Sequence, residues 1–282
     1  MKKNLPISAI AAVLIIMLPG ISSMLNAQGV NISYKYPADK AVNYKLTSTM
    51  AQIMDIEGQT MQSDVNSAFG CSVRSAGNQN GNLILEVTVD TLGQVTSSPM
   101  GGSGGPVRGV KGKSCKIVIA PDGKIVDITG AEGLVYTIDG SGESNLGQTL
   151  SDFFPRLPGK VMNAGDTWTY KDSTTTKSAS MTMTTIDNAG NKVEGFEKIG
   201  DMDCAKIVST HSGNISMAVQ SQGMDIYIKG PYTGTSECFF AIKEGYFVRM
   251  ASATLIKGNL ELPSMGMNMP VTIDMKSECV SR

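Results

Sequence analysis

The sequence has little of the chemistry that most enzyme sites use, since its 282 residues include a single histidine, His211. His211 stands in Ser209-Thr-His-Ser-Gly213, a segment typical of a solvated turn. A Ser/His or Cys/His catalytic site also needs an orienting acid, and none is indicated near His211 in the sequence. We therefore predict no catalytic residue and expect the protein not to be an enzyme.

An excess of one charge is also missing. The 24 Lys and Arg residues nearly balance the 25 Asp and Glu residues, for a formal net charge of −1. A nucleic-acid partner is not expected, because phosphate binding needs a basic face. The calcium-loop pattern is absent, and the G-x-S-x-G match at Gly101–Gly105 lies in a glycine-rich run rather than in a strand–turn–helix elbow. No cofactor is predicted.

Long apolar runs are lacking except near the N-terminus. Lys2 and Lys3 precede the apolar run Ala9–Leu18, which is too short to cross about 30 Å of hydrocarbon. This layout predicts a cleavable signal peptide over residues 1–27. The first cysteine, Cys71, is far from the cleavage point, so a lipoprotein is not expected. We predict an exported, periplasmic or secreted protein that is soluble, not lipid-anchored and without a transmembrane segment after cleavage.

The cysteines lack a C-x-x-C motif, so neither a redox pair nor a zinc knuckle is indicated. In an oxidising compartment they are expected to form disulfides, but their spacing leaves the pairing open. The five candidates are Cys71, Cys115, Cys204, Cys238 and Cys279.

The sequence contains many short alternations of apolar and polar residues separated by turn residues. Three segments are predicted to be hairpin turns: Pro121–Gly123, Asp187–Asn191 and Lys243–Gly245. Repeated hairpins predict a mostly β protein made of antiparallel curved sheets or a half-barrel.

The chain divides into two β lobes. The first is predicted over residues 28–130, with a glycine-rich mobile loop at about 97–112. A linker over 131–164 contains a short helix, because the apolar residues of Leu146–Phe154 recur at helical spacing. The second lobe covers residues 165–282.

Methionine is the compositional oddity, with 18 residues. Met265, Met267 and Met269 alternate along one predicted strand, so their thioethers would share a face, and soft thioethers select Cu(I). The alternative is a flexible apolar face, because methionines are spread along the other predicted strands and line adaptable surfaces.

The stretch Phe153-Phe-Pro-Arg-Leu-Pro-Gly-Lys-Val-Met-Asn-Ala-Gly-Asp-Thr-Trp168 resembles the central segment of an uncharacterised family of exported bacterial β proteins, a domain of unknown function. The general pattern is also similar to the lipoprotein-carrier class, in which a curved antiparallel sheet cups a helix and sometimes an acyl chain. These resemblances imply the fold and carry no catalytic residues over. Within the stretch, Gly165-Asp166 is predicted to be a turn, and Trp168 and Tyr170 to share one face of a strand.

The favoured function is an exported, non-enzymatic binding protein whose methionine-rich sheet face holds a hydrophobic ligand or a protein partner. One alternative is a structural or surface-assembly protein without a small-molecule ligand. The other is a periplasmic Cu(I)-binding protein that uses the Met-x-Met-x-Met strand.

Overall fold

The computed structural model describes residues 29–282 apart from 57, 100, 108, 139–141, 179 and 222. The predicted signal peptide, residues 1–27, lies outside the described residues.

The described chain is almost entirely strand, with two short α-helices and one 3-10 helix. In chain order the elements are β1 (Val30–Asn31), β2 (Val42–Ile56), β3 (Gln59–Gln79), β4 (Asn82–Ser98), β5 (Gly101–Pro106), β6 (Ser114–Ile119), β7 (Ile125–Asp127), α1 (Thr129–Glu132), β8 (Val135–Ile138), β9 (Gly142–Asn145), α2 (Leu146–Leu150), β10 (Val161–Met162), β11 (Thr167–Lys177), β12 (Met181–Ile199), β13 (Met202–Ser221), β14 (Met224–Ala241), β15 (Tyr246–Leu262), η1 (Pro263–Met265) and β16 (Met267–Ser281).

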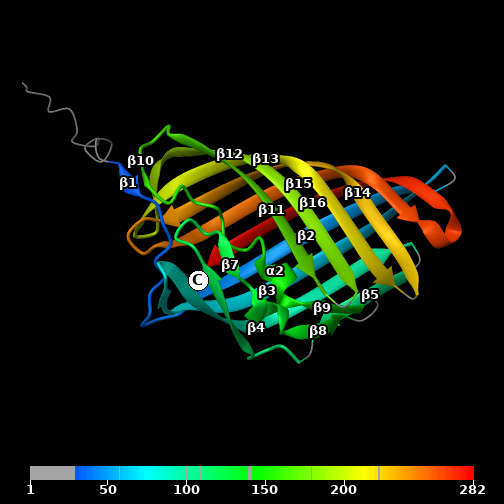
Figure 1. The fold of residues 1–282 in the computed structure, drawn as a ribbon, viewed down its shortest axis with the longest axis horizontal. Helices are drawn as coiled ribbons and strands as arrows, with labels where there is room; N and C mark the ends of the chain where they lie inside the picture. The colour runs from blue at the N-terminus through cyan, green and yellow to red at the C-terminus, as the bar shows by residue number, and fades with distance from the viewer. Residues whose placement is uncertain are drawn as a thin grey trace, which may run out of the picture.

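Twelve strands form one antiparallel, curved sheet, which confirms the predicted fold class (Figure 1). Its order is β11-β12-β13-β14-β15-β16-β2-β3-β4-β6-β7, and β5 pairs with the distal part of β4. Strands from both predicted lobes lie in this sheet, because β16 pairs with β2. The two edges are β11 and β7. Two further small sheets are made by β1 with β10 and by β8 with β9.

Strict alternation of side chains positions the core on the inner, concave face. In β6, for example, Cys115, Ile117 and Ile119 are buried and the residues between them are not. Successive side chains of a strand point to opposite faces, so this pattern leaves the outer face exposed to solvent and the inner face buried.

Two of the three predicted hairpin turns are confirmed. Pro121–Gly123 lies between β6 and β7, and Lys243–Gly245 lies between β14 and β15. The last residue of each turn has a positive φ, 83° at Gly123 and 77° at Gly245, which glycine adopts without steric cost.

The third predicted turn, Asp187–Asn191, is wrong. These residues lie in the middle of β12 and pair with β11 on one side and β13 on the other. The local turn propensity of Asp, Asn and Gly is overridden because neighbours satisfy the polar side chains. Asp187 hydrogen-bonds His211, and Asn191 donates to the carbonyl of Trp168.

The predicted glycine-rich loop at about 97–112 is also wrong over part of its length. Gly101–Pro106 is strand β5, paired with residues 93–98 of β4. Glycine permits this pairing, since a Cβ on Gly104 would collide with the backbone of Gln94.

The predicted short helix is confirmed as α2. Leu146 and Leu150 are fully buried, and Phe153 and Phe154 follow in the same core. Their rings join the aromatic cluster, which consists of Tyr34, Tyr36, Tyr44, Phe69, Phe153, Phe154, Phe240, Tyr246 and Phe247. The cluster fills one end of the inner face with edge-on and stacked contacts, such as Tyr44 on Phe247 at 4.6 Å.

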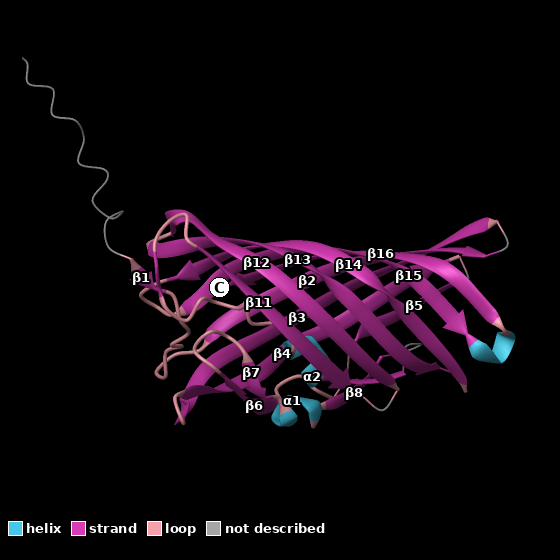
Figure 2. Ribbon diagram, turned by 45° about the horizontal axis from the view of Figure 1, so that its top comes forward, coloured by secondary structure: helices cyan, strands magenta, loops and turns pink. Residues whose placement is uncertain are grey.

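The linker lies along the open side of the sheet, where α1, α2, β8 and β9 gather (Figure 2). These elements contact both ends of the sheet order. A Cβ on Gly130 of α1 would meet the carbonyl of Lys116 in β6, the strand next to the edge strand β7. At the other end, the Asn145 side chain donates to the Lys177 carbonyl of β11 at 2.7 Å.

Arg156 ties the two edges together. Its guanidinium binds Asp172 of β11 at 2.6 Å and Asp122 of the β6–β7 turn at 3.0 Å. It also lies over the ring of Tyr170, 4.9 Å from the centroid. One planar cation thus bridges strands at opposite ends of the sheet order.

Candidate functional site: a polar belt on the inner face

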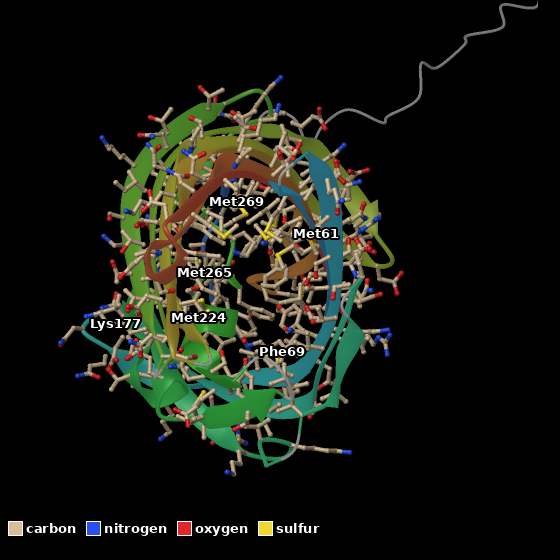
Figure 3. The ribbon with its side chains drawn as sticks, turned by 90° about the vertical axis from the view of Figure 1, so that its right-hand side faces the viewer. Met61, Phe69, Lys177, Met224, Met265 and Met269 are labelled. Carbon is tan, nitrogen blue, oxygen red and sulfur yellow. The ribbon has the colours of Figure 1, made fainter. Side chains whose placement is uncertain are left out.

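The inner face is divided along its length into three zones. The aromatic cluster occupies one end. The other end holds the methionine cluster, a buried group with partly exposed methionines around it: Ile228, Ile256, Leu260, Met269, Val271 and Ile273, flanked by Met50, Met54, Met217, Met267 and Met275. Figure 3 shows Met61 and Met269 on the inner side of the strands, with other sulfur atoms beside them. Between the two apolar zones runs a polar belt.

A row of six serines, with an amide side chain at each end, runs along the belt and is called the serine row. Its members are direct cross-strand partners from β12 through to β4: Asn191, Ser209, Ser236, Ser252, Ser277, Ser48, Ser67 and Gln94. Because residues opposite each other on neighbouring strands share a face, all of them lie on the inner side.

Hydrogen bonds link the row internally. The hydroxyls of Ser252 and Ser277 are 2.8 Å apart, and those of Ser48 and Ser67 are 2.6 Å apart. Ser209 donates to Asn191 at 2.7 Å. The serines are only partly buried, so water reaches the belt.

His211 lies next to this row, between an acid and a hydroxyl. Its Nδ1 is 3.0 Å from Oδ2 of Asp187 on β12, and its Nε2 is 3.3 Å from Oγ of Ser236 on β14. The three residues come from adjacent strands and form a diagonal across the inner face. The predicted solvated turn at His211 is therefore wrong, since this residue lies in β13 with both ring nitrogens partnered.

Asp187 is held as a carboxylate by several donors. Burial raises its pKa, but hydrogen bonds from His211 and Tyr232 outweigh burial, so the pKa is lowered overall. The Tyr232 hydroxyl donates to Oδ1 at 2.7 Å. The phenols of Tyr170 and Tyr232 keep their protons, because burial and the negative charge of Asp187 raise both tyrosine pKa values.

Gly213 makes the contact between Tyr232 and Asp187 possible. The three residues are in register across β12, β13 and β14, with Gly213 in the middle. A Cβ on Gly213 would lie 3.0 Å from the Tyr232 ring and would collide with the carbonyl of Ile186. Without a side chain there, the phenol crosses β13 and reaches the acid.

The partners of His211 fix its tautomer. An ionised carboxylate only accepts hydrogen bonds, so in the neutral imidazole the proton lies on Nδ1, facing Asp187. Nε2 then presents its lone pair to the Ser236 hydroxyl, which donates.

Asp152 follows α2 and lies near the Asp187 carboxylate. Its side chain is solvent-accessible although protein surrounds it. Desolvation raises its pKa, and the negative charge of Asp187 raises it further. The linker thus brings a second acid near the diagonal of Asp187, His211 and Ser236.

The three predicted copper ligands do not share one strand. Met265 lies in η1 and is 59% exposed, whereas Met267 and Met269 lie in β16. Met269 is buried in the methionine cluster and Met267 packs against it. Among the described residues, no group of three His, Cys, Asp or Glu side chains is placed to hold a metal ion.

The predicted disulfides are not formed, because all five cysteines are free and buried. No cysteine is the cross-strand partner of another cysteine. Cys238 on β14 and Cys279 on β16, for example, both pair with Met250 on β15, which lies between them. A disulfide needs Cα atoms about 4.4–6.8 Å apart, which strands about 9.6 Å apart cannot supply. Burial raises the pKa of Cys115 to about 11 and that of Cys279 to about 12.

The outer face carries a shallow groove across β11 to β16. Small side chains such as Thr210, Ala251 and Ala253 line it, between charged ones such as Lys192 and Arg249. None of the methionines lines this groove.

Sequence reasoning missed the site because its parts are far apart in the chain and each looks like a turn residue. Asp187 was assigned to a hairpin and His211 to a turn. The only available signal was alternation: Asp187, Ala189, Asn191 and Val193 continue the period of two of a long strand. Trp168 and Tyr170 do share a face of β11, as predicted.

No family model matches the sequence, and no curated protein matches it. Among solved structures, the chain is similar to one described as a "putative lipoprotein" from Parabacteroides distasonis, at 13% identity, covering 89% of this chain and 97% of the other with a TM-score of 0.24. It is similar to Pseudomonas aeruginosa OccK2 in complex with glucuronate, at 4% identity, covering 88% and 100%, TM-score 0.24. A DUF1329 family protein from Desulfovibrio piger is 10% identical, covering 84% and 85%, TM-score 0.15.

At such TM-scores the similarities carry no argument about this chain. In the described part of the chain, no helix is both long and apolar enough to cross a membrane.

Proposed function

We propose that this protein is an exported binding protein that holds a single-chain amphiphile along the inner face of its sheet. The apolar tail lies on the methionine cluster and the polar head lies at the belt. The observation that carries the proposal is the boundary itself: an apolar zone and a hydrogen-bonding zone meet on one concave face.

The dimensions suit this ligand. From Ser252 in the belt to Leu260 at the far end of the methionine cluster, β15 rises about 27 Å. One leaflet of a hydrocarbon core about 30 Å thick is about 15 Å, so a single lipid tail fits on this face.

Methionine suits a face that opens for a ligand. The buried members of the cluster pack on one another, while Met50, Met217 and Met275 around them remain partly exposed. Unbranched thioether side chains repack at low cost, so they can move aside for a tail of variable length.

The test is native mass spectrometry of the exported protein, followed by titration with a fluorescent dodecyl amphiphile. We expect a bound mass that is lost on denaturation, and saturable binding of the probe. Met217→Gln and Met275→Gln should each weaken binding about fivefold to tenfold, because they place an amide against the tail.

The matched control is Met265→Gln, which changes an exposed methionine on η1 and should leave binding unchanged. A bare native mass and no probe binding would contradict the proposal and favour a structural or surface-assembly role. A retained copper ion would favour the Cu(I) alternative.

A further inference from the structure

The diagonal of Asp187, His211 and Ser236 has the connectivity of a nucleophile relay. In the neutral imidazole, the Nδ1–H group donates a hydrogen bond to the acid, and the opposite ring nitrogen accepts one from the hydroxyl. In this arrangement the base is oriented by a third group and faces the hydroxyl that it would deprotonate. The sequence indicates no orienting acid near His211, whereas the structure places the Asp187 carboxylate 3.0 Å from its Nδ1.

The relay is rigidly supported. Asp187 is fixed by Tyr232 across Gly213, and the three strands pair continuously around it. A site on paired strands holds its geometry better than one on loops.

Ser236 also lies where the polar end of a bound amphiphile is expected. With the tail on the methionine cluster, an ester next to the head reaches into the polar belt. Ser236 stands inside that belt, in the serine row, and on the inner face of β14 only Gly234 separates it from Tyr232, which packs against the methionine cluster.

Ser252 supplies a hydroxyl beside the nucleophile. It is the direct cross-strand partner of Ser236 on β15, and its own partner is the Ser277 hydroxyl at 2.8 Å. Backbone N–H groups within the sheet are used by the ladder, so a side-chain hydroxyl is the available donor to a developing oxyanion.

We propose that Ser236, activated by His211 and Asp187, hydrolyses a carboxylic ester in the amphiphile that the inner face binds. This inference rests on the proposed function and names its ligand class, a single-chain carboxylic ester. Asp187 is a positioning residue, and Ser252 stabilises the oxyanion.

The reaction balances without a redox partner. Ser236 Oγ bonds to the ester carbonyl carbon while its proton passes to Nε2 of His211. The bond from that carbon to the alkoxy oxygen breaks, and the alcohol leaves with the proton. Water then attacks the acyl-serine, His211 takes one of its protons, and the carboxylic acid is released as Ser236 regains a proton.

The first experiment uses the full exported protein and a fluorophosphonate probe, which phosphonylates activated serines. Peptide mapping should find one adduct, on Ser236. His211→Gln should abolish labelling, whereas Ser114→Ala, which changes an exposed hydroxyl on the outer face of β6, should leave it intact. An adduct on another residue, or none, would overturn the inference.

The second experiment follows hydrolysis of p-nitrophenyl dodecanoate. Ser236→Ala should lower turnover at least about 1,000-fold, and Ser252→Ala about 100-fold through the rate of the chemical step rather than through KM. Equal rates in wild type and Ser236→Ala would overturn the inference.

Native mass spectrometry separates this inference from the function on which it rests. The protein is incubated with a monoacylglycerol and, separately, with the alkyl-ether analogue. We expect the ether to stay bound and the ester to be converted to its acid. An intact bound ester would overturn the hydrolysis alone, and binding of neither compound would also contradict the proposed function.

Discussion

At the scale of single residues, burial raises the pKa of the Asp187 carboxyl and hydrogen bonds lower it. Its donors hold its folded-state pKa below the ordinary value, so the ionised form stabilises the fold. That stabilisation is fully present above the unfolded pKa of about 3.9 and is lost as the pH falls through the lower folded value.

The corresponding prediction concerns Asp187→Asn. At pH 7 the amide should lower the free energy of unfolding by about 1–3 kcal/mol, because it replaces an acceptor of charged hydrogen bonds. The difference between variant and wild type should begin to shrink below about pH 4, where the carboxyl of the unfolded chain takes up its proton, and should disappear as the pH falls through the lower folded pKa. Urea unfolding at both pH values measures this, and a constant difference would contradict the assignment.

Gly213 gives a second prediction at this scale. Gly213→Ala should destabilise the protein by about 2 kcal/mol or more, since the new Cβ would meet the Ile186 carbonyl and displace the Tyr232 ring. Gly195→Ala in the neighbouring β12 is the matched control, because nothing lies within 4 Å of its added Cβ. Thermal melts of the two variants compare them directly.

The third prediction at this scale concerns the reactivity of the cysteine thiols. Ellman's reagent reacts with thiolates, and the raised pKa of thiols such as Cys115 and Cys279 keeps them protonated at pH 8. The native protein should therefore react slowly, and all five thiols should react in guanidinium chloride without a reductant. Fewer than five under those conditions would reveal a disulfide.

At the scale of elements, Arg156 links the two ends of the sheet order, because it forms ion pairs with both β11 and the β6–β7 turn. Arg156→Leu should cost about 2–4 kcal/mol, since it leaves Asp122 and Asp172 without their shared cation in a partly buried site. Arg74→Leu removes the exposed pair with Glu86 and should cost less than about 1 kcal/mol. Chemical unfolding of both variants is the measurement.

Element by element, the sequence indicated strands well where turn residues interrupt alternation, as at Pro121–Gly123 and Lys243–Gly245. It failed where turn-forming residues lie inside a strand. Asp187–Asn191 is polar because its inner side chains belong to the belt, and Gly101–Pro106 is glycine-rich because β5 packs closely against β4. Local composition does not distinguish these cases, since the partner strands lie far away in the chain.

The site was even less accessible to sequence reasoning. Asp187, His211 and Ser236 are separated by more than twenty residues at each step, and only the register of β12 with β13 and of β13 with β14 aligns them. The methionine-rich inner face, by contrast, was predicted from alternation alone, and the structure places Met50, Met217, Met269 and Met275 on it.

At the scale of the whole molecule, the inner face forms a gradient from aromatic rings through hydroxyls to thioethers. A gradient of this kind orients an amphiphile in one direction only, because reversing the ligand would place its polar head on the methionine cluster. In the complex that we propose, position along β13 to β16, rather than separate pockets, would distinguish the headgroup from the tail.

The pairing of β16 with β2 has a consequence for the order of events during synthesis. The sheet has no complete inner face until its last strand inserts between β15 and the first long strand, with nearly the whole described chain made in between. Such distant pairing makes folding slow. For the exported protein that we propose, a chain that has not yet paired β16 with β2 remains unfolded, and an unfolded chain is the state that can pass through a narrow translocation channel.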